Sequence, residues 1–180
     1  MCAEVTTKRR TKSAEQALSA LMRECAKAEK STGDARRLMA RWEVPIGERE
    51  GVIERLMEMK FIDNRRFAHS YMRDKLNLSG WGAQRIRLEL GRKGVEREIV
   101  DEVLSDLDRD AMQQRLETML AKRLRTLKYK DQYDLKNKLM RYGASLGYDY
   151  SAVRDAIDQA TQNAITSNNN NDEEWTESYF

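Results

Sequence analysis

The sequence predicts an all-α protein in which three tandem three-helix repeats form an elongated, curved array. Three observations carry this prediction. Apolar residues recur at helical spacing throughout residues 13–162. Residues that break helices separate the apolar stretches. The whole pattern returns about every 50 residues, which is typical of a repeat protein. The composition agrees, because helix-favouring residues are common while β-branched and aromatic residues are sparse.

The first repeat is expected over residues 13–60. Ser13 and Gln16 form a capping box at the start of its first helix. Gly33 and the stretch 45–47 separate three apolar stripes with helical spacing. The stripes contain Ala14, Ala17, Leu18, Leu21, Met22 and Cys25, then Ala35, Leu38, Met39 and Trp42, then Val52, Ile53, Leu56 and Met57.

The second and third repeats are expected over residues 61–109 and 110–162. Gly94 and Gly147 each follow a basic helical stretch, as helix C-terminal cap residues do. Apolar positions recur 47 and 53 residues apart, in the series Ile53, Val100, Val153 and the series Met57, Leu104, Ile157. The alternative is a single irregular helical bundle, since a period observed in one sequence can arise without a repeat.

The two ends of the chain differ from this core. Residues 1–12 are polar with a net charge of +3, and we expect a flexible segment without the apolar stretch of a signal peptide. Residues 163–180 are rich in asparagine, carry a net charge of −4 and are expected to be disordered. Trp175, Tyr179 and Phe180 either dock on the body or mark a partner-binding segment.

Charges are segregated along the chain. Residues 65–97 and 113–141 each carry a net charge of +6, whereas 43–63 and 99–110 carry −3 and −4. Stacked repeats would align these runs into a basic side and an acidic side, and a basic side suits a polyanion or a large complementary partner. The alternative is a solvated surface with ion pairs inside the helices, but runs of one sign leave few such pairs.

No catalytic or cofactor-binding pattern is present. His69 has no acid or nucleophile at a fixed spacing, Cys25 completes an apolar stripe, and Gly80-Trp81-Gly82 is explained by a helix start as well as by a phosphate-binding loop. One histidine and two cysteines provide no standard zinc set and no disulfide framework. We therefore expect no enzyme activity, no cofactor and no metal. The longest uncharged run, 159–171, is too short and polar to span a membrane, so we expect a cytoplasmic protein.

Two segments of the middle repeat carry the most distinctive pattern: Phe61-Ile-Asp-Asn-Arg-Arg-Phe-Ala-His-Ser-Tyr71 and Gly80-Trp-Gly-Ala-Gln-Arg-Ile-Arg-Leu-Glu-Leu-Gly-Arg-Lys-Gly-Val95. In this pattern Asp63 can cap the helix that bears Phe67 and Tyr71. The pattern resembles the RecX family of recombination regulators. The likeness extends to Lys138-Leu-Met-Arg-Tyr142 and Leu146-Gly-Tyr148, and more weakly to Arg36-Arg-Leu-Met-Ala-Arg-Trp42. Asn64 and Ala83 depart from it, because an acidic residue and proline are common at these positions.

The resemblance implies a regulator of recombination, repair and the SOS response. Such a protein binds the RecA recombinase on single-stranded DNA and limits the extension and activity of the filament. Single-stranded DNA is a second candidate partner, contacted directly. A monomer is expected. The alternative function is sequence-nonspecific nucleic-acid binding without a recombinase partner. The candidate contacts for the partner or DNA are Arg65, Arg66, Arg73, Arg85, Arg87, Arg92, Lys93, Lys122, Arg123, Arg125, Lys128, Lys130, Lys136, Lys138 and Arg141.

Overall fold

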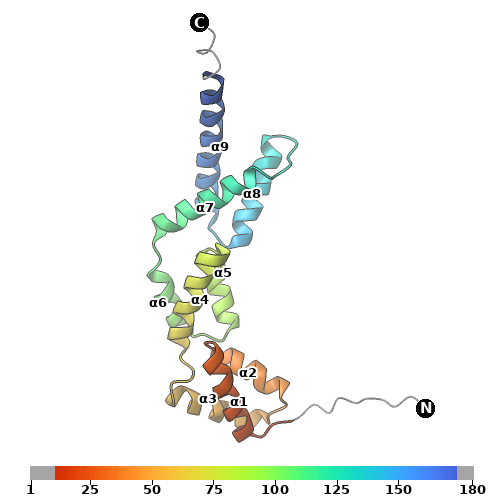
Figure 1. The fold of residues 1–180 in the computed structure, drawn as a ribbon, viewed down its shortest axis with the longest axis vertical. Coiled ribbons are helices and arrows are strands. Elements are labelled where there is room, and N and C mark those ends of the chain that lie inside the picture. The colour runs from red at the N-terminus through yellow and green to blue at the C-terminus, as the bar shows by residue number, and fades with distance from the viewer. Residues whose placement is uncertain (1–10, 174–180) are drawn as a thin grey trace, which may run out of the picture. The chain divides into compact units, whose positions relative to one another are not determined.

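The computed structural model describes residues 11–173, and the side chains of residues 11–162. Within these residues all regular structure is helical, which confirms the predicted all-α class (Figure 1). The helices are α1 (Ala14–Lys27), α2 (Thr32–Arg41), α3 (Ile46–Glu58), α4 (Asn64–Ser79), α5 (Ala83–Arg92), α6 (Arg97–Ser105), α7 (Arg109–Leu124), α8 (Gln132–Leu146) and α9 (Tyr150–Glu173). None of the described helices has the length and apolar character needed to cross a membrane.

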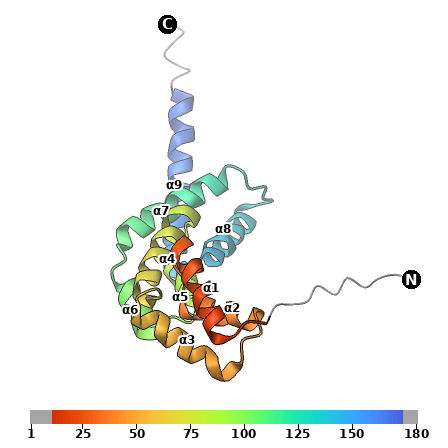
Figure 2. The same cartoon turned by 60° about the horizontal axis from the view of Figure 1, so that its bottom comes forward.

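The chain forms two compact units. The first comprises the chain up to Met72 together with Leu88–Val103, and the second comprises Arg73–Arg87 together with the chain from Leu104. The first unit contains α1–α3, where α3 packs against α1 and α2 (Figure 2). Its core is formed by Ala17, Leu18, Leu21, Ala35, Met39, Val44, Val52, Ile53, Leu56 and Ile62. The predicted capping box of Ser13 and Gln16 starts α1, and Asp63 accepts a hydrogen bond from the backbone of Arg66 at the start of α4.

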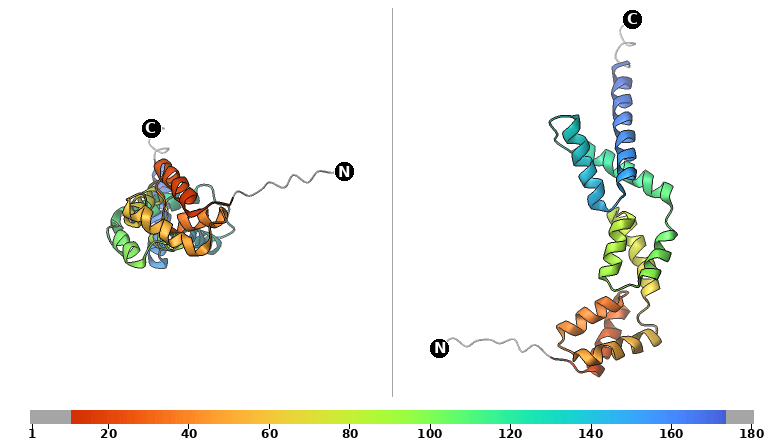
Figure 3. Two further views of the ribbon diagram at one scale, coloured as in Figure 1. Left: turned by 90° about the horizontal axis from the view of Figure 1, so that it is seen from below. Right: turned by 180° about the vertical axis from the view of Figure 1, so that it is seen from behind.

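In the second unit, α9 packs against α7 and α8 (Figure 3). Its core is formed by Leu116, Leu120, Leu135, Leu139, Leu146, Tyr148, Val153, Ala156 and Ile157. The predicted stripe residues Ile53, Val100 and Val153 are all buried in their units. Met57 is an exception: 39% of its surface is exposed, because its neighbour Leu56 occupies the core.

Helices α2, α5 and α8 end in turns of the same construction. A residue with left-handed backbone follows each helix: Glu43 (φ 54°), Gly94 (φ 73°) and Gly147 (φ 87°). The N–H of the next residue donates to the carbonyl five residues earlier, in the pairs Val44–Met39, Val95–Leu90 and Tyr148–Gly143. This bond closes a Schellman-type cap, so the predicted cap roles of Gly94 and Gly147 are confirmed.

Two of these turns receive the N-terminus of another helix, and we call each such contact a joint. In joint 1, in the first unit, the N–H of Gly33 at the start of α2 donates to the carbonyl of Lys93 at 3.1 Å. In joint 2, in the second unit, the N–H of Gly82 just before α5 donates to the carbonyl of Leu146 at 2.7 Å. Glycine is required on the docking helix because an added Cβ would lie 2.3 Å from the Lys93 oxygen or 2.4 Å from the Gly147 oxygen. The joints therefore bring two backbones into direct contact.

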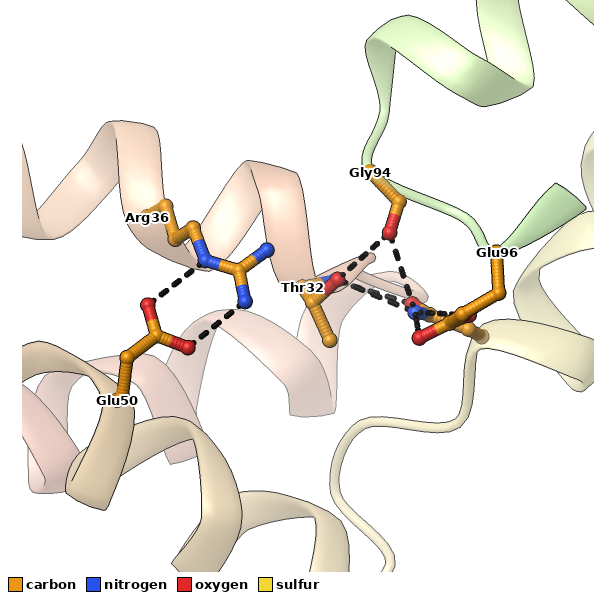
Figure 4. Close-up of polar contacts among 6 residues, drawn as sticks. Thr32, Arg36, Glu50, Gly94 and Glu96 are labelled. Atoms are coloured by element: carbon orange, nitrogen blue, oxygen red, sulfur yellow. Dashed lines mark hydrogen bonds and ion pairs between the residues drawn. The ribbon is translucent and has the colours of Figure 1, made fainter.

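Joint 1 also contains a polar network that includes Thr32, Gly94 and Glu96 (Figure 4). At its centre is Asn64, which is 3% exposed. Its Oδ1 accepts the N–H of Thr32 at 3.0 Å, and its Nδ2 donates to Glu96 Oε2 at 2.9 Å and to Thr32 Oγ1 at 3.1 Å. The Thr32 hydroxyl donates to the Gly94 carbonyl at 3.0 Å. An amide satisfies this site because it accepts and donates, whereas an aspartate would place a second carboxylate beside Glu96.

The predicted ends of the core differ from the structure in two respects. Lys12, within the segment expected to be flexible, donates its backbone N–H to the Trp42 carbonyl. Helix α9 continues past residue 162 to Glu173, within the segment expected to be disordered. Neither glycine nor proline follows Gly147, so the sequence holds no residue that stops a helix sharply. The expectations for residues 1–10 and for Trp175, Tyr179 and Phe180 lie outside the described residues. The exact boundaries of the repeats and the elongated, curved arrangement stay predictions.

Candidate functional site

The four candidate contacts in the first unit are all ion-paired. Arg65 pairs with Glu102, and Arg66 pairs with Glu29 at 2.6 Å. Arg92 pairs with Glu89 at 2.6 Å, and Lys93 with Asp34 at 2.9 Å. The sequence suggested few ion pairs within the helices, and of these four pairs only Arg92–Glu89 lies within one helix. The partners of Arg65, Arg66 and Lys93 lie on other helices or loops, where a count of charges within one run does not find them.

Asp34 is the carboxylate around which the cations of joint 1 gather. Burial alone raises the pKa of Asp34, but hydrogen bonds from Lys93 and Arg37 lower it by more, and the resulting pKa lies below the ordinary value. Arg37 also donates to the carbonyl of Arg92 at 3.0 Å, which precedes the turn. The cations of this region thus hold α2 against the end of α5, and this makes them structural.

Several candidates in the second unit are also engaged. Lys136 pairs with Asp158 on α9 at 3.1 Å, and Lys138 pairs with Asp134 at 2.7 Å. Arg85 donates to the carbonyl of Ser145 at 2.9 Å in joint 2, while its guanidinium lies 4.1 Å from the ring centre of Trp81. Arg85 repeats the role of Arg37 in joint 1, so we assign it to the framework.

The remaining cations gather where α7 ends and α8 begins. We call this surface the basic edge and define it by Lys122, Arg123, Arg125, Lys128 and Lys130. All five are exposed, and no carboxylate among the described side chains lies within ion-pairing distance of them. Arg123 lies over the ring of Tyr142 at 5.6 Å. Of the other candidates, Arg73, Arg87 and Arg141 are exposed but lie away from this connection along the chain.

Local structure explains why the basic edge is exposed. Leu116 and Leu120 anchor α7 in the core, so the opposite side of its last turn faces solvent. The chain then runs through residues 125–131, and Asp131 starts α8 by accepting the N–H of Asp134 at 2.7 Å. The N-termini of α2 and α5 are covered in the two joints. Within the described residues the α8 N-terminus donates to no such turn.

Two tyrosines that were not among the predicted contacts lie beside the basic edge, Tyr129 before α8 and Tyr133 in its first turn. Tyr129 is 47% exposed and Tyr133 is 79% exposed. Tyr129 stands between Lys128 and Lys130 in the sequence, but the spacing of apolar residues does not show whether an aromatic ring is buried. Flat exposed rings beside cations can stack on nucleic-acid bases or pack into a protein groove.

Other features of the described residues carry no comparable chemistry. No group of three or more histidine, cysteine, aspartate or glutamate side chains is placed to bind a metal ion. Cys25 is a free thiol, and partial burial raises its pKa. A pocket of about 460 Å³ in the first unit is lined by the stacked rings of Phe67 and Tyr71, but its Asp34 and Lys93 already pair with each other.

The fold and this surface define an all-α protein of three-helix repeats that exposes a cationic edge at the end of its α7–α8 hairpin. The model of the second three-helix domain of RecX matches residues 63–104, and the model of the third matches residues 110–157. The chain belongs to the RecX family.

Relatives and solved structures agree with this assignment. The regulatory protein RecX of Clostridium botulinum (strain Eklund 17B / Type B) is 32% identical over 110 residues, which are 60% of this chain and 51% of that one. RecX of Mycobacterium sp. (strain JLS) is 34% identical over 110 residues, which are 59% and 60% of the two chains. The match thus spans about half the length of these relatives. The crystal structure of RecX from Lactobacillus salivarius superposes with a TM-score of 0.71 at 17% identity, over 83% of this chain and 97% of that one, and shows the same helical repeat fold.

Proposed function

We propose that this chain binds the filament of the RecA recombinase on single-stranded DNA and limits its extension and activity. Membership of the RecX family, whose curated relatives are named regulatory proteins, supports a regulatory role. The observation that carries the proposal is the basic edge, where five exposed cations form no ion pair within 4 Å among the described side chains. Regulation by binding requires such a surface and no catalytic group.

The charges of the basic edge fit a partner lined by carboxylates or phosphates. Cations already paired inside the molecule would have to exchange one partner for another, and this exchange contributes little. Unpaired cations lose only their hydration and counterions, so they speed the encounter and orient the molecule. Each contact with a phosphate also releases counterions, and binding is therefore expected to weaken steeply as salt concentration rises.

A second candidate function is direct, sequence-nonspecific binding of single-stranded nucleic acid. Tyr129 and Tyr133 favour it, since exposed rings near cations form the stacking surface that such proteins use. This candidate differs from the first in stoichiometry. A protein that covers DNA must saturate the strand to inhibit, whereas a protein that stops filament growth acts on few sites.

The test is a titration of this protein into RecA that hydrolyses ATP on single-stranded DNA. The proposal predicts inhibition when the protein is present at far less than one molecule per RecA. Inhibition that begins only when the protein saturates the DNA would favour the second candidate. A parallel titration on the DNA without RecA, followed by fluorescence anisotropy, establishes where saturation occurs.

A further inference from the structure

The turn after α2 is contacted by Lys12, just before α1, and not by the helix N-terminus of another repeat. In the two joints, the carbonyl before the left-handed residue (Lys93 or Leu146) accepts a glycine N–H from the preceding repeat. The equivalent carbonyl in the first repeat belongs to Trp42, and no repeat precedes it among the described residues. This carbonyl accepts the N–H of Lys12 at 3.0 Å.

The side chain of Lys12 strengthens the same contact. Its ammonium lies 4.7 Å from the centre of the Trp42 ring, which is the geometry of a cation–π interaction. Lys12 stands directly before Ser13, the N-cap of α1, so the strong cap fixes the chain next to it. The backbone and the side chain of one residue therefore both bind Trp42.

The residue type in the left-handed position also differs between the first repeat and the two joints. Joints 1 and 2 have glycine there, and a Cβ on Gly94 would lie 3.1 Å from the Gly33 nitrogen, while one on Gly147 would lie 2.4 Å from the Arg85 Cβ. The first repeat has Glu43 at this position with the same backbone conformation. A side chain is accepted because residues outside any helix, and not a helix N-terminus, cover the turn.

We infer that the Trp42–Val44 turn is a docking edge of the same kind as the two joints, and that residues 11–12 form a strap that closes it. The edge fits an extended backbone that supplies one N–H to Trp42 and one cation to its ring. The strap does for the first repeat what each preceding repeat does for the next: it gives a hydrogen-bond donor to the turn and covers the end of the helix. Val44, which is 1% exposed, and Met39 belong to the core of the first unit next to this turn. This inference does not depend on the proposed function.

The test uses the full chain with Lys12→Pro, which removes the donated N–H and leaves the capping box of Ser13 and Gln16 intact. Thr11→Pro is the matched control, because it constrains the chain next to Lys12 but retains that N–H. Amide hydrogen exchange is measured at Glu43 and Val44, whose N–H groups close the turn, and at Gly94 and Val95, which hold the equivalent places in joint 1. We expect Lys12→Pro to speed exchange at Glu43 and Val44 about tenfold and to leave Gly94 and Val95 unchanged.

Two further measurements test the strap if Lys12→Pro perturbs the fold more widely. In the unmodified chain the Lys12 amide should be protected about tenfold or more relative to an unfolded chain. The variant Lys12→Met keeps the N–H and loses the cation, so it should produce a smaller acceleration at Val44 than Lys12→Pro. An unprotected Lys12 amide, or equal exchange in the Lys12→Pro and Thr11→Pro chains, would overturn the assignment of the strap.

Discussion

The two units differ in how many of their candidate cations are ion-paired. In the first unit, the candidates Arg65, Arg66, Arg92 and Lys93 each meet a carboxylate, and Lys93 with Asp34 lies in joint 1. In the second unit, Arg85 takes part in joint 2 and Lys136 and Lys138 are paired, whereas the five cations of the basic edge form no ion pair within 4 Å among the described side chains. Sequence segments with similar positive charge thus form ion pairs within the first unit but leave an exposed cationic surface on the second.

The two joints share their backbone contacts and one guanidinium contact, and they differ in their other side chains. Both depend on a glycine N–H, a left-handed turn and a guanidinium that binds the carbonyl two residues before the turn glycine. Joint 1 adds the buried network of Asn64, Thr32 and Glu96, while joint 2 adds an exposed contact of Gln84 with Asp149 at 3.2 Å. Substitutions at the glycines that make the backbone contacts should therefore destabilise the two joints to a similar extent. Substitutions of the side chains found in one joint should destabilise that joint more than the other.

The largest effect is expected at the glycines of the docking helices. Gly33→Ala and Gly82→Ala each place a Cβ within 2.4 Å of a backbone atom, so each should lower the free energy of unfolding by about 3 kcal/mol. Gly51→Ala in α3 is the control: nothing lies within 4 Å of its Cβ position, and alanine there should stabilise by about 0.5–1 kcal/mol. Urea unfolding measures all three. A harmless alanine at position 33 or 82 would show that the joints do not exclude a side chain.

Asn64→Asp should distinguish joint 1 from joint 2. The change replaces a buried donor to Glu96 with a second carboxylate, and we expect a loss of about 2 kcal/mol in unfolding free energy. Adding Glu96→Gln should restore most of this loss, because an amide can again donate between the two groups. Gln84→Glu, the corresponding change beside Asp149 in joint 2, lies at an exposed position and should cost less than about 0.5 kcal/mol. Equal losses at the two joints would contradict the distinction.

Acid should weaken joint 1 through Asp34. Because the pKa of Asp34 is lowered in the folded state, its charged form stabilises the protein above the unfolded pKa of about 3.9, and this contribution is lost as pH falls through the folded pKa. Lys93→Met should therefore cost about 1 kcal/mol at pH 7 and progressively less below about pH 4. Lys136→Met, which breaks an exposed pair with Asp158, should change stability by less than about 0.5 kcal/mol at any pH. Thermal unfolding between pH 7 and pH 3 makes this comparison.

The smallest effect is expected where the first repeat lacks a joint. Glu43 occupies a left-handed conformation that glycine adopts at less cost, so Glu43→Gly should stabilise by up to about 1 kcal/mol. Gly147→Ala, at the equivalent turn of joint 2, should instead destabilise by more than this amount, because its Cβ would approach Arg85 within 2.4 Å. Chemical denaturation of both variants gives the sign. A destabilising Glu43→Gly would indicate that the Glu43 side chain contributes to the turn.

The sequence predicted the helices and their caps well because both depend on neighbouring residues. Gly94 and Gly147 were recognised as cap residues, since glycine after a basic helical stretch is a local pattern. The equivalent turn at Glu43 was not predicted, because its conformation follows from the repeat and not from the residue type. The ion pair of Arg66 with Glu29 joins residues 37 positions apart, so charge runs along the chain could not predict it. The basic edge was contained in the predicted set, but only packing separated it from the paired candidates.

The most direct test of the account reverses Lys122, Arg123 and Arg125 of the basic edge to glutamate. These side chains are exposed, so the fold should persist and circular dichroism should remain helical. The control reverses Arg23, Arg97 and Arg109, three exposed cations outside the edge, and thereby makes the same change in net charge.

The measured quantity is the concentration of protein that halves the ATP hydrolysis of RecA on single-stranded DNA. The account predicts that reversal of the basic edge raises this concentration at least tenfold, which corresponds to about 1.4 kcal/mol of binding free energy, while the control raises it much less. Equal impairment of the two variants at equal stability, or no impairment of either, would contradict the claim that the basic edge binds the filament.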